Sequence, residues 1–276
     1  MAAIDKAVIL AAGRGSRIAA VAGDTPKPLL TLDGRPGTVT FLDWHVRCLA
    51  AIGVREIYVV GNRRTYGAAL PAIRTARIEW ILNPSDDLLG SGSAHSLWFA
   101  WNSAYSILDR RSRVAVLDAD IVYDPALLDD LVRAPRDRSK TLVASVYQQT
   151  GEEVLVFADR SDRTCLRFHG KGLLRTCLVD GCTCLGEATG ILLWEPQDHE
   201  LLRSITEWTI RCSSAGARSE HEDVTQQMMS LHRLAAVCFG PERAFLEVDT
   251  PEDYRLLVDE IYPRVQTKVP PLAMGR

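Results

Sequence analysis

Residues 7–17, AVILAAGRGSR, decide the fold. The first four residues predict a short buried strand, and the small residues and arginines that follow predict a tight turn. Downstream of this turn, apolar strand patterns alternate with amphipathic helix patterns over more than a hundred residues. Such an alternation predicts parallel β-α-β units with helices on both faces of a sheet. We therefore expect an α/β protein.

The remaining pattern predicts one mixed α/β domain over residues 1–265, with a Rossmann-like, mainly parallel sheet. The second half, about 136–265, is expected to add a small antiparallel subregion, and residues 266–276 a flexible tail. Strands are expected at 7–10, 56–60, 78–82, 114–117, 142–147, 154–158, 165–168, 190–194 and 245–248. Helices are expected at 42–52, 93–105, 126–132, 198–212, 223–231 and from 250 onward.

Composition excludes several classes of protein. With 35 acidic and 32 basic residues the formal charge is −3, which lacks the basic excess of a dedicated nucleic-acid binder. Apolar runs stay far below the roughly 18 residues of a membrane span. The first apolar stretch is interpreted as a buried strand rather than a signal peptide, so we expect a cytoplasmic protein with no nucleic-acid or membrane partner. The seven cysteines are expected to be reduced, because they are odd in number and scattered in a chain without a secretion signal. The spacing of Cys177, Cys182 and Cys184 fits no zinc motif.

The turn after the first strand has the features of an anion-binding loop. Small residues let main-chain N–H groups approach an anion, and Arg14, Arg17 and Lys27 add positive charge. Pro26 and Pro28 flank the lysine and restrict its backbone near the loop. A tight turn with solvated arginines is the alternative interpretation.

The combination LAAGRGSR…PKPLL, residues 10–17 and 26–30, resembles the nucleotidyltransferases that activate sugar phosphates and alcohol phosphates. Among them the chain is most similar to bacterial choline-phosphate cytidylyltransferases and their phosphonate-specific relatives, from Lys6 to Tyr262. The resemblance implies a nucleotide-binding half, about 1–135, and an acceptor-binding half, about 136–265. It implies that Arg17 and Lys27 stabilise charge on the α-phosphate. It also implies nucleotide contacts from Leu10, Ala11, Ala12, Gly13, Arg14 and Gly15.

Two acidic strand ends suggest a metal site. The strand at 114–117 runs into Asp118-Ala119-Asp120, and a later strand ends in Glu247-Val248-Asp249. Carboxylates suit Mg²⁺, which takes one or two of them together with substrate phosphates, although turn or capping aspartates are the alternative. The resemblance implies that Asp120 and Asp249 are the metal ligands. Asp118 is a weaker assignment on the nucleotide side, and Glu247 is expected to orient the site from farther away.

Contacts to the base and the acceptor follow from the same resemblance. Asn83, Gly92 and Ser93 precede or open a helix and would contact the nucleotide, with helix capping as the alternative. His95 is assigned no chemistry, because a phosphate oxygen is already ionised at neutral pH. Acceptor contacts are expected from Lys171, Glu187, Glu222 and Asp223. The last two acids either attract a cationic amine or complement the helix dipole.

We therefore expect a Mg²⁺-dependent cytidylyltransferase. It would couple CTP to a small phosphate or phosphonate acceptor, such as phosphocholine or 2-aminoethylphosphonate, and release pyrophosphate. Two alternatives stay open: a sugar-1-phosphate nucleotidyltransferase that uses UTP or dTTP, and a non-catalytic nucleotide-binding module. A homodimer is a further expectation, although the sequence does not fix the oligomeric state.

Overall fold

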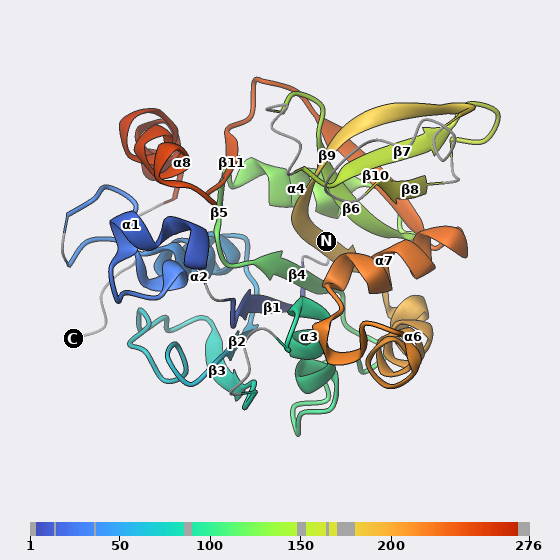
Figure 1. Cartoon of the computed structure of the whole chain (residues 1–276), viewed down its shortest axis with the longest axis horizontal. Coiled ribbons are helices and arrows are strands. Elements are labelled where there is room, and N and C mark those ends of the chain that lie inside the picture. Colours follow the sequence, from blue (N-terminus) through green and yellow to red (C-terminus); the bar gives the residue numbers. More distant parts are fainter. Residues whose placement is uncertain are drawn as a thin grey trace.

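A mixed β-sheet forms the centre of the protein (Figure 1). The structure is a computed structural model that describes residues 4–13, 15–35, 37–85, 90–147, 153–163, 166–169 and 180–269. In this part of the chain the strand order is β10-β6-β9-β4-β1-β2-β3, with β7 beside β9 and β8 beside β7. A separate two-stranded ribbon joins β11 to β5.

The strands are β1 (Lys6–Ala11), β2 (Glu56–Gly61), β3 (Arg77–Leu82), β4 (Val114–Asp118), β5 (Ile121–Tyr123), β6 (Ser139–Ala144), β7 (Leu155–Asp159), β8 (Leu166–His169), β9 (Cys182–Trp194), β10 (Leu234–Phe239) and β11 (Phe245–Glu247). The main helices are α1 (Ala19–Ala22), α2 (Phe41–Ala51), α3 (Ser93–Trp101), α4 (Ala126–Arg133), α6 (His199–Cys212), α7 (His221–Ser230), α8 (Pro251–Leu256) and α9 (Tyr262–Val265). Short helical turns are η1 (Ser16–Ile18), η2 (Lys27–Leu29), η3 (Pro196–Asp198), η4 (Gly216–Arg218), η5 (Leu257–Ile261) and η6 (Gln266–Lys268). Among the described residues, no helix is long and apolar enough to cross a bilayer.

The parallel strands β3, β2, β1 and β4 position the two N-terminal motifs. In the register of β1 and β4, Leu10 lies opposite Asp118. The amide of Ala119 then donates to the Leu10 carbonyl at 3.2 Å. The glycine turn and the Asp118–Asp120 segment therefore leave the sheet side by side. This is where ligands bind in open α/β sheets, at the carboxyl ends of the strands.

Helices cover both faces of the sheet because successive strand residues point to opposite sides. In β1, Ala7 and Ile9 pack into a core with α2, α4 and the C-terminal helices. Val8 and Leu10 pack into a second core with α3, α6 and α7. Antiparallel additions lie on the β9 side, where β9 pairs with β4, β6 and β7 (Figure 1). The expected mixed, mainly parallel α/β fold with helices on both faces is confirmed.

Several boundaries differ from the sequence prediction. Strands β5 and β10 had not been predicted, and β9 begins eight residues before the expected 190. The helix expected at 93–105 ends at Trp101, and α7 begins at His221 rather than at residue 223. Residues 266–269 of the expected tail pack on the domain: Val269 is buried and Lys268 pairs with Asp124 at 2.6 Å. Residues 270–276 lie outside the described residues.

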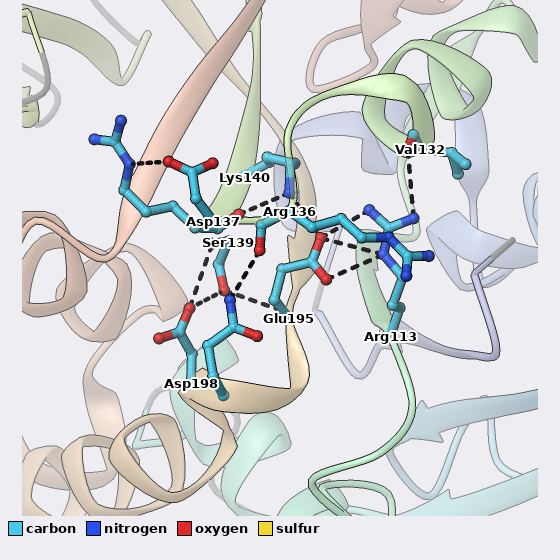
Figure 2. Close-up of polar contacts among 10 residues, drawn as sticks. Arg113, Val132, Arg136, Asp137, Ser139, Lys140, Glu195 and Asp198 are labelled. Carbon is cyan, nitrogen blue, oxygen red and sulfur yellow. Dashed lines mark hydrogen bonds and ion pairs between the residues drawn. The ribbon is translucent and has the colours of Figure 1, made fainter. Parts of the chain in front are cut away.

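A buried ionic network connects the amino-terminal ends of β4 and β6 to the residue that follows β9 (Figure 2). It lies at the opposite end of β4 from the pocket described below. Glu195, which follows β9, accepts hydrogen bonds at 2.7 Å from Arg113 ahead of β4 and from Lys140 in β6. All three side chains are at most 3% exposed. Close by, Asp198 accepts a hydrogen bond from Ser139 at 2.6 Å. The network joins β4, β6 and β9 without contributing to the pocket.

Candidate active site

A pocket of about 440 Å³ opens at the carboxyl ends of β1 and β4. Its volume lies in the range of small-molecule sites, roughly 300–1,000 Å³. The structure gathers predicted site residues from five separate segments around it. Those that line the pocket are Leu10, Ala12, Gly13, Gly15, Arg17, Lys27, Asn83, Gly92, Ser93, Asp118, Asp120, Glu222 and Asp249.

The glycine turn is held by the end of β2. Asn62 donates to the Ala12 carbonyl at 2.8 Å, and Thr65 donates to the Ala11 carbonyl at 3.1 Å. The Ala11 side chain is buried in the core, so only the backbone of Ala11 is left for the predicted nucleotide contact. Sequence reasoning missed Asn62 and Thr65, although an Asn and a Thr after a buried strand are a signal for a side-chain–backbone anchor.

Gly15 sets the distance between the turn and Lys27. Its φ is +62°, and a Cβ there would lie 2.8 Å from the Cβ of Lys27. Both observations explain the glycine, because a side chain at this position meets backbone strain and a steric clash. The turn therefore packs directly against the lysine that the two prolines hold. Arg14 lies outside the described residues.

Lys27 is the buried cation of the pocket. Its ammonium donates to Asp120 Oδ2 and to Asp249 Oδ1, each at 2.9 Å. Burial alone lowers the pKa of Lys27, but the charges and hydrogen bonds of the two aspartates raise it above its ordinary value. Arg17 contacts the other oxygen of Asp249 at 2.8 Å and is half exposed. Lys27 and Arg17, the two cations predicted to act at the α-phosphate, thus both contact Asp249.

The ribbon of β5 and β11 brings the distant acids together. In its register, Glu247 pairs with Ile121, and the Val248 amide donates to the Asp120 carbonyl at 3.0 Å. Asp249 follows directly, and its amide donates to Asp253 in the first turn of α8 at 3.1 Å. Carboxylate oxygens of Asp120, Glu247 and Asp249 lie within 4.8 Å of one another.

Glu247 is a member of this acidic group rather than a more distant orienting residue, which corrects the sequence expectation. Burial, and then the charges of Asp120, Asp249 and Asp118, hold the pKa of the Glu247 carboxyl well above its ordinary value. Three oxygen donors at this spacing suit a hard divalent cation such as Mg²⁺. A cation there would reduce the repulsion among the three carboxyl groups, which the charge of Lys27 already offsets in part. The residues present therefore fit a magnesium site.

Asp118 turns away from this group toward α7. Its Oδ2 lies 3.1 Å from Nε2 of His221, whose Nδ1 lies 2.5 Å from Glu222. Burial opposes a charge on the imidazole, but Asp118 and Glu222 hold the pKa of His221 well above its ordinary value. The two carboxylates therefore favour the protonated form of the imidazole that His221 buries in the pocket wall. Gly190 has a φ of +68° and leaves room for Asp118, since a Cβ there would lie 2.1 Å from Oδ2.

The rim that was expected to meet the base is built on hydrogen bonds of side chains and backbone. The side-chain amide of Asn83 donates to the hydroxyls of Ser91 and Ser96, each at 3.1 Å. Gly92 opens α3, and its amide donates to the Ala217 carbonyl at 2.8 Å. Asn83 thus shapes this rim with its own side chain.

Other predicted residues lie elsewhere. Asp223 is exposed, accepts a hydrogen bond from the Glu220 amide at 3.0 Å and does not line the pocket, so it caps α7. Glu187 lies in β9 and is absent from the pocket lining, although its neighbour Ala188 lines a smaller adjoining cavity. His95 contacts Ser91 at 3.0 Å outside the pocket lining. Lys171, Cys165 and Cys177 lie outside the described residues. The described cysteines, including Cys182 and Cys184, are free thiols.

These features define a class of protein. A glycine turn after the first strand, a lysine and an arginine beside it, and acids at the ends of two further strands suit the transfer of a phosphorylated group from a nucleotide. The comparisons with known proteins agree: residues 7–180 match the MobA-like NTP transferase domain, and the chain belongs to this family.

Individual relatives are more distant. Over 181 residues, 62% of this chain, it is 30% identical to the CMP-5'-(3-aminopropyl)phosphonate synthase of Streptomyces rubellomurinus. Over 101 residues, 37% of the chain, it is 35% identical to the N-acetylmuramate alpha-1-phosphate uridylyltransferase of Neisseria meningitidis. The matches cover 27% and 33% of those relatives, about a quarter and a third of their lengths. The inositol-1-phosphate CTP transferase of T. maritima has the same fold, with a TM-score of 0.68, 17% identity and 96% and 98% of the two chains covered.

Proposed function

We propose that this protein is a magnesium-dependent cytidylyltransferase that joins CTP to a small phosphate or phosphonate acceptor and releases pyrophosphate. The observation that carries the proposal is the meeting of Lys27 with Asp120 and Asp249, each at 2.9 Å. These residues come from three distant segments and place positive charge beside a group of metal-type ligands. Such an arrangement serves phosphoryl transfer, in which positioning and charge neutralisation supply most of the rate.

The reaction that fits this geometry is an in-line displacement. An acceptor oxygen attacks the α-phosphorus, the bond from that phosphorus to the oxygen bridging to the β-phosphate breaks, and pyrophosphate leaves with the electron pair. Lys27 and Arg17 meet the negative charge that grows on the phosphate oxygens. Asp120, Asp249 and Glu247 would hold Mg²⁺, which neutralises the phosphates and orients the attacking oxygen.

The choice of CTP and of a phosphonate acceptor is supported by the names of relatives: one is a CMP-phosphonate synthase and another a CTP transferase. The adjoining cavity, of about 40 Å³, has room for a primary ammonium group of an acceptor that lies in the main pocket. Among the described residues it is lined by Asp118, Glu222 and Glu247, with His221 as the basic member. In this described part the carboxyl groups outnumber the imidazole, and carboxyl groups are suitable partners for an ammonium group. Phosphocholine and 2-aminoethylphosphonate are thus the first acceptors to test.

Pyrophosphate release tests the proposal directly. CTP, UTP, dTTP and ATP are each assayed with 2-aminoethylphosphonate, phosphocholine, glycerol phosphate and hexose 1-phosphates. We expect release with CTP and an amine-bearing acceptor and none without Mg²⁺. Release with UTP or dTTP and a sugar 1-phosphate would favour the sugar-phosphate alternative, for which the Neisseria relative is an argument. Binding of CTP without release from any acceptor would favour a non-catalytic module.

Asp120→Asn tests the metal site within the same assay. We expect kcat to fall by roughly 10²–10⁴-fold with an unchanged unfolding midpoint, because the variant removes one ligand charge. Near-normal turnover would refute the assignment. A homodimer and a cytoplasmic location also belong to the proposal, and analytical ultracentrifugation and cell fractionation test them.

A further inference from the structure

Helices α3 and α7 lie side by side at the edge of the pocket (Figure 1). Hydrogen bonds connect residues 92–94 at the start of α3 to residues 217–221 at the start of α7, and we call this set of contacts the joint. Glu220, directly before α7, accepts hydrogen bonds from the amide of Ser93 at 2.7 Å and from its hydroxyl at 2.6 Å. The Ser93 hydroxyl in turn accepts a hydrogen bond from the His221 amide at 2.7 Å. The backbone amides of Ser93 and His221 are therefore each bonded by a side chain from the start of the other helix, while within α7 Glu220 also forms a capping box with Asp223.

The backbone reinforces this joint. The Gly92 amide donates to the Ala217 carbonyl at 2.8 Å, and the Ala94 amide donates to the Ser219 carbonyl at 3.1 Å. A Cβ on Gly92 would lie 2.2 Å from the Ser219 carbonyl oxygen. The two segments are thus in direct backbone contact along residues 92–94 and 217–221. Neither segment can move far without the other.

The joint connects the regions assigned to the two substrates. Gly92 and Ser93 belong to the rim expected to meet the nucleotide, whereas His221 and Glu222 also line the adjoining cavity proposed for the acceptor. Glu220 lines the main pocket but belongs to neither the cation pair nor the acidic metal group. Its carboxylate is the charged member of the joint, and hydrogen bonds to a charged acceptor are the stronger kind.

We propose that Glu220 is a positioning residue that couples the binding of the two substrates by fixing the start of α3 to the start of α7. A substrate that orders one rim then orders the other, so the second substrate binds a prepared site. The coupling is reciprocal, as linkage requires. This inference rests on the proposed function, because it needs two substrates in one pocket.

Calorimetric titration measures the coupling without turnover. The affinity for α,β-methylene-CTP is measured with Mg²⁺, with and without saturating 2-aminoethylphosphonate. In the wild-type protein we expect the acceptor to tighten nucleotide binding by about tenfold, within the usual range of roughly 5–150-fold for coupled sites. Glu220→Ala is expected to reduce this factor to about one. Glu220→Gln is expected to keep part of it, because its amide oxygen still accepts hydrogen bonds without the charge.

Glu207→Ala is the matched control. Glu207 is an acid on α6 that also holds α3, by accepting a hydrogen bond from the Trp98 indole, but it does not line the pocket. Its replacement loosens α3 without touching the joint, so the coupling factor is expected to stay at the wild-type value. A loss of coupling in this control would mean that general loosening of α3, not Glu220, sets the effect, and would overturn the proposal.

The remaining outcomes separate this inference from the proposed function. Wild-type coupling in Glu220→Ala, or a factor of one in an active wild-type protein, would overturn the inference and leave the proposed function intact. Failure of the wild-type protein to bind the CTP analogue, together with no pyrophosphate release from CTP, would overturn the proposed function itself. In a double-mutant cycle, Ser93→Ala should add nothing to the loss of coupling in Glu220→Ala.

Discussion

Single glycines determine where the charged side chains of the pocket lie. Gly15 has a positive φ and touches Lys27, and Gly190 has a positive φ and touches Asp118. Neither position tolerates a side chain without a shift of the charged residue beside it. Gly13 differs, because a Cβ there would meet nothing within 4 Å. The three glycines thus allow a controlled comparison.

Gly15→Ala is expected to lower the free energy of unfolding by about 1–3 kcal/mol, because it adds left-handed strain and crowds Lys27. It should also reduce pyrophosphate release at saturating substrate. Gly13→Ala should change stability by well under half of that amount. Urea denaturation of both variants measures the difference, and equal losses would contradict the role given to Gly15.

His199 makes the stability of the protein depend on pH. It opens α6, is buried, and accepts a hydrogen bond from the Arg110 amide at Nδ1, 3.1 Å away. Burial lowers the pKa of His199 to about 4. The folded protein therefore resists protonation, whereas the unfolded chain takes up a proton near pH 6.5. The stabilisation is complete above about pH 6.5 and is lost as the pH falls toward 4.

His199→Asn tests this dependence. The amide oxygen of asparagine replaces Nδ1 as the acceptor but does not titrate. We expect the variant to lose less stability than the wild-type protein between pH 6.5 and 4, with a difference on the order of 3 kcal/mol. Urea midpoints over this pH range provide the measurement. Identical pH profiles would show that folding does not lower the pKa of His199.

At the scale of elements, the start of a helix decides which acids face the pocket. The sequence predicts α7 from residue 223, but the helix begins at His221. The earlier start places His221 and Glu222 in the first turn of the helix and makes Asp223 its third residue, the position of a capping-box acid. Glu222 and His221 therefore reach the pocket while Asp223 caps the helix. The N-cap Glu220 gives little signal in the sequence, because its strongest contacts are with Ser93 in another helix.

Strands show the same limit. Strand β4 and its terminal acids were predicted because a dense apolar run ends there. Strand β10, LAAVCF, was missed because small residues dominate a short edge strand, and its pairing with β6 is what makes it a strand. The polar first half of β9 was missed for a similar reason, since it depends on pairing with β7. Contacts between distant segments determine these elements.

The network around Glu195 should stabilise the elements that carry the pocket. Glu195→Gln leaves the cations of Arg113 and Lys140 buried without their counter-charge, which is expected to cost about 3–5 kcal/mol. The exposed pair of Arg110 and Glu200 is the matched comparison, and Glu200→Gln should cost at most about 1 kcal/mol. Denaturant titrations of both variants compare them. A loss below 1 kcal/mol for Glu195→Gln would contradict this role.

At the scale of the whole molecule, the pocket exists because three distant segments converge. The sequence is sufficient to predict that Asp120 lies at the carboxyl end of a parallel strand, because the positions of strand ends follow from the α/β pattern. The place of Lys27 beside the site was predicted from its flanking prolines and from the family resemblance. The position of Glu247 next to Asp120 and Asp249 could not be predicted from the sequence. It depends on the register of β11 against β5, and β5 is a three-residue strand without a clear pattern of its own.

The central claim is that Lys27 and Asp249, 222 residues apart in the chain, act as one catalytic centre. A double-mutant cycle of pyrophosphate release, with CTP, 2-aminoethylphosphonate and Mg²⁺, tests it most directly. Lys27→Met and Asp249→Asn are each expected to lower kcat by roughly 10²–10⁴-fold, and the double variant is expected to be no slower than the slower single variant, because residues that act as a unit are not additive. A double variant in which the two losses multiply would show that the residues act independently and would contradict the account.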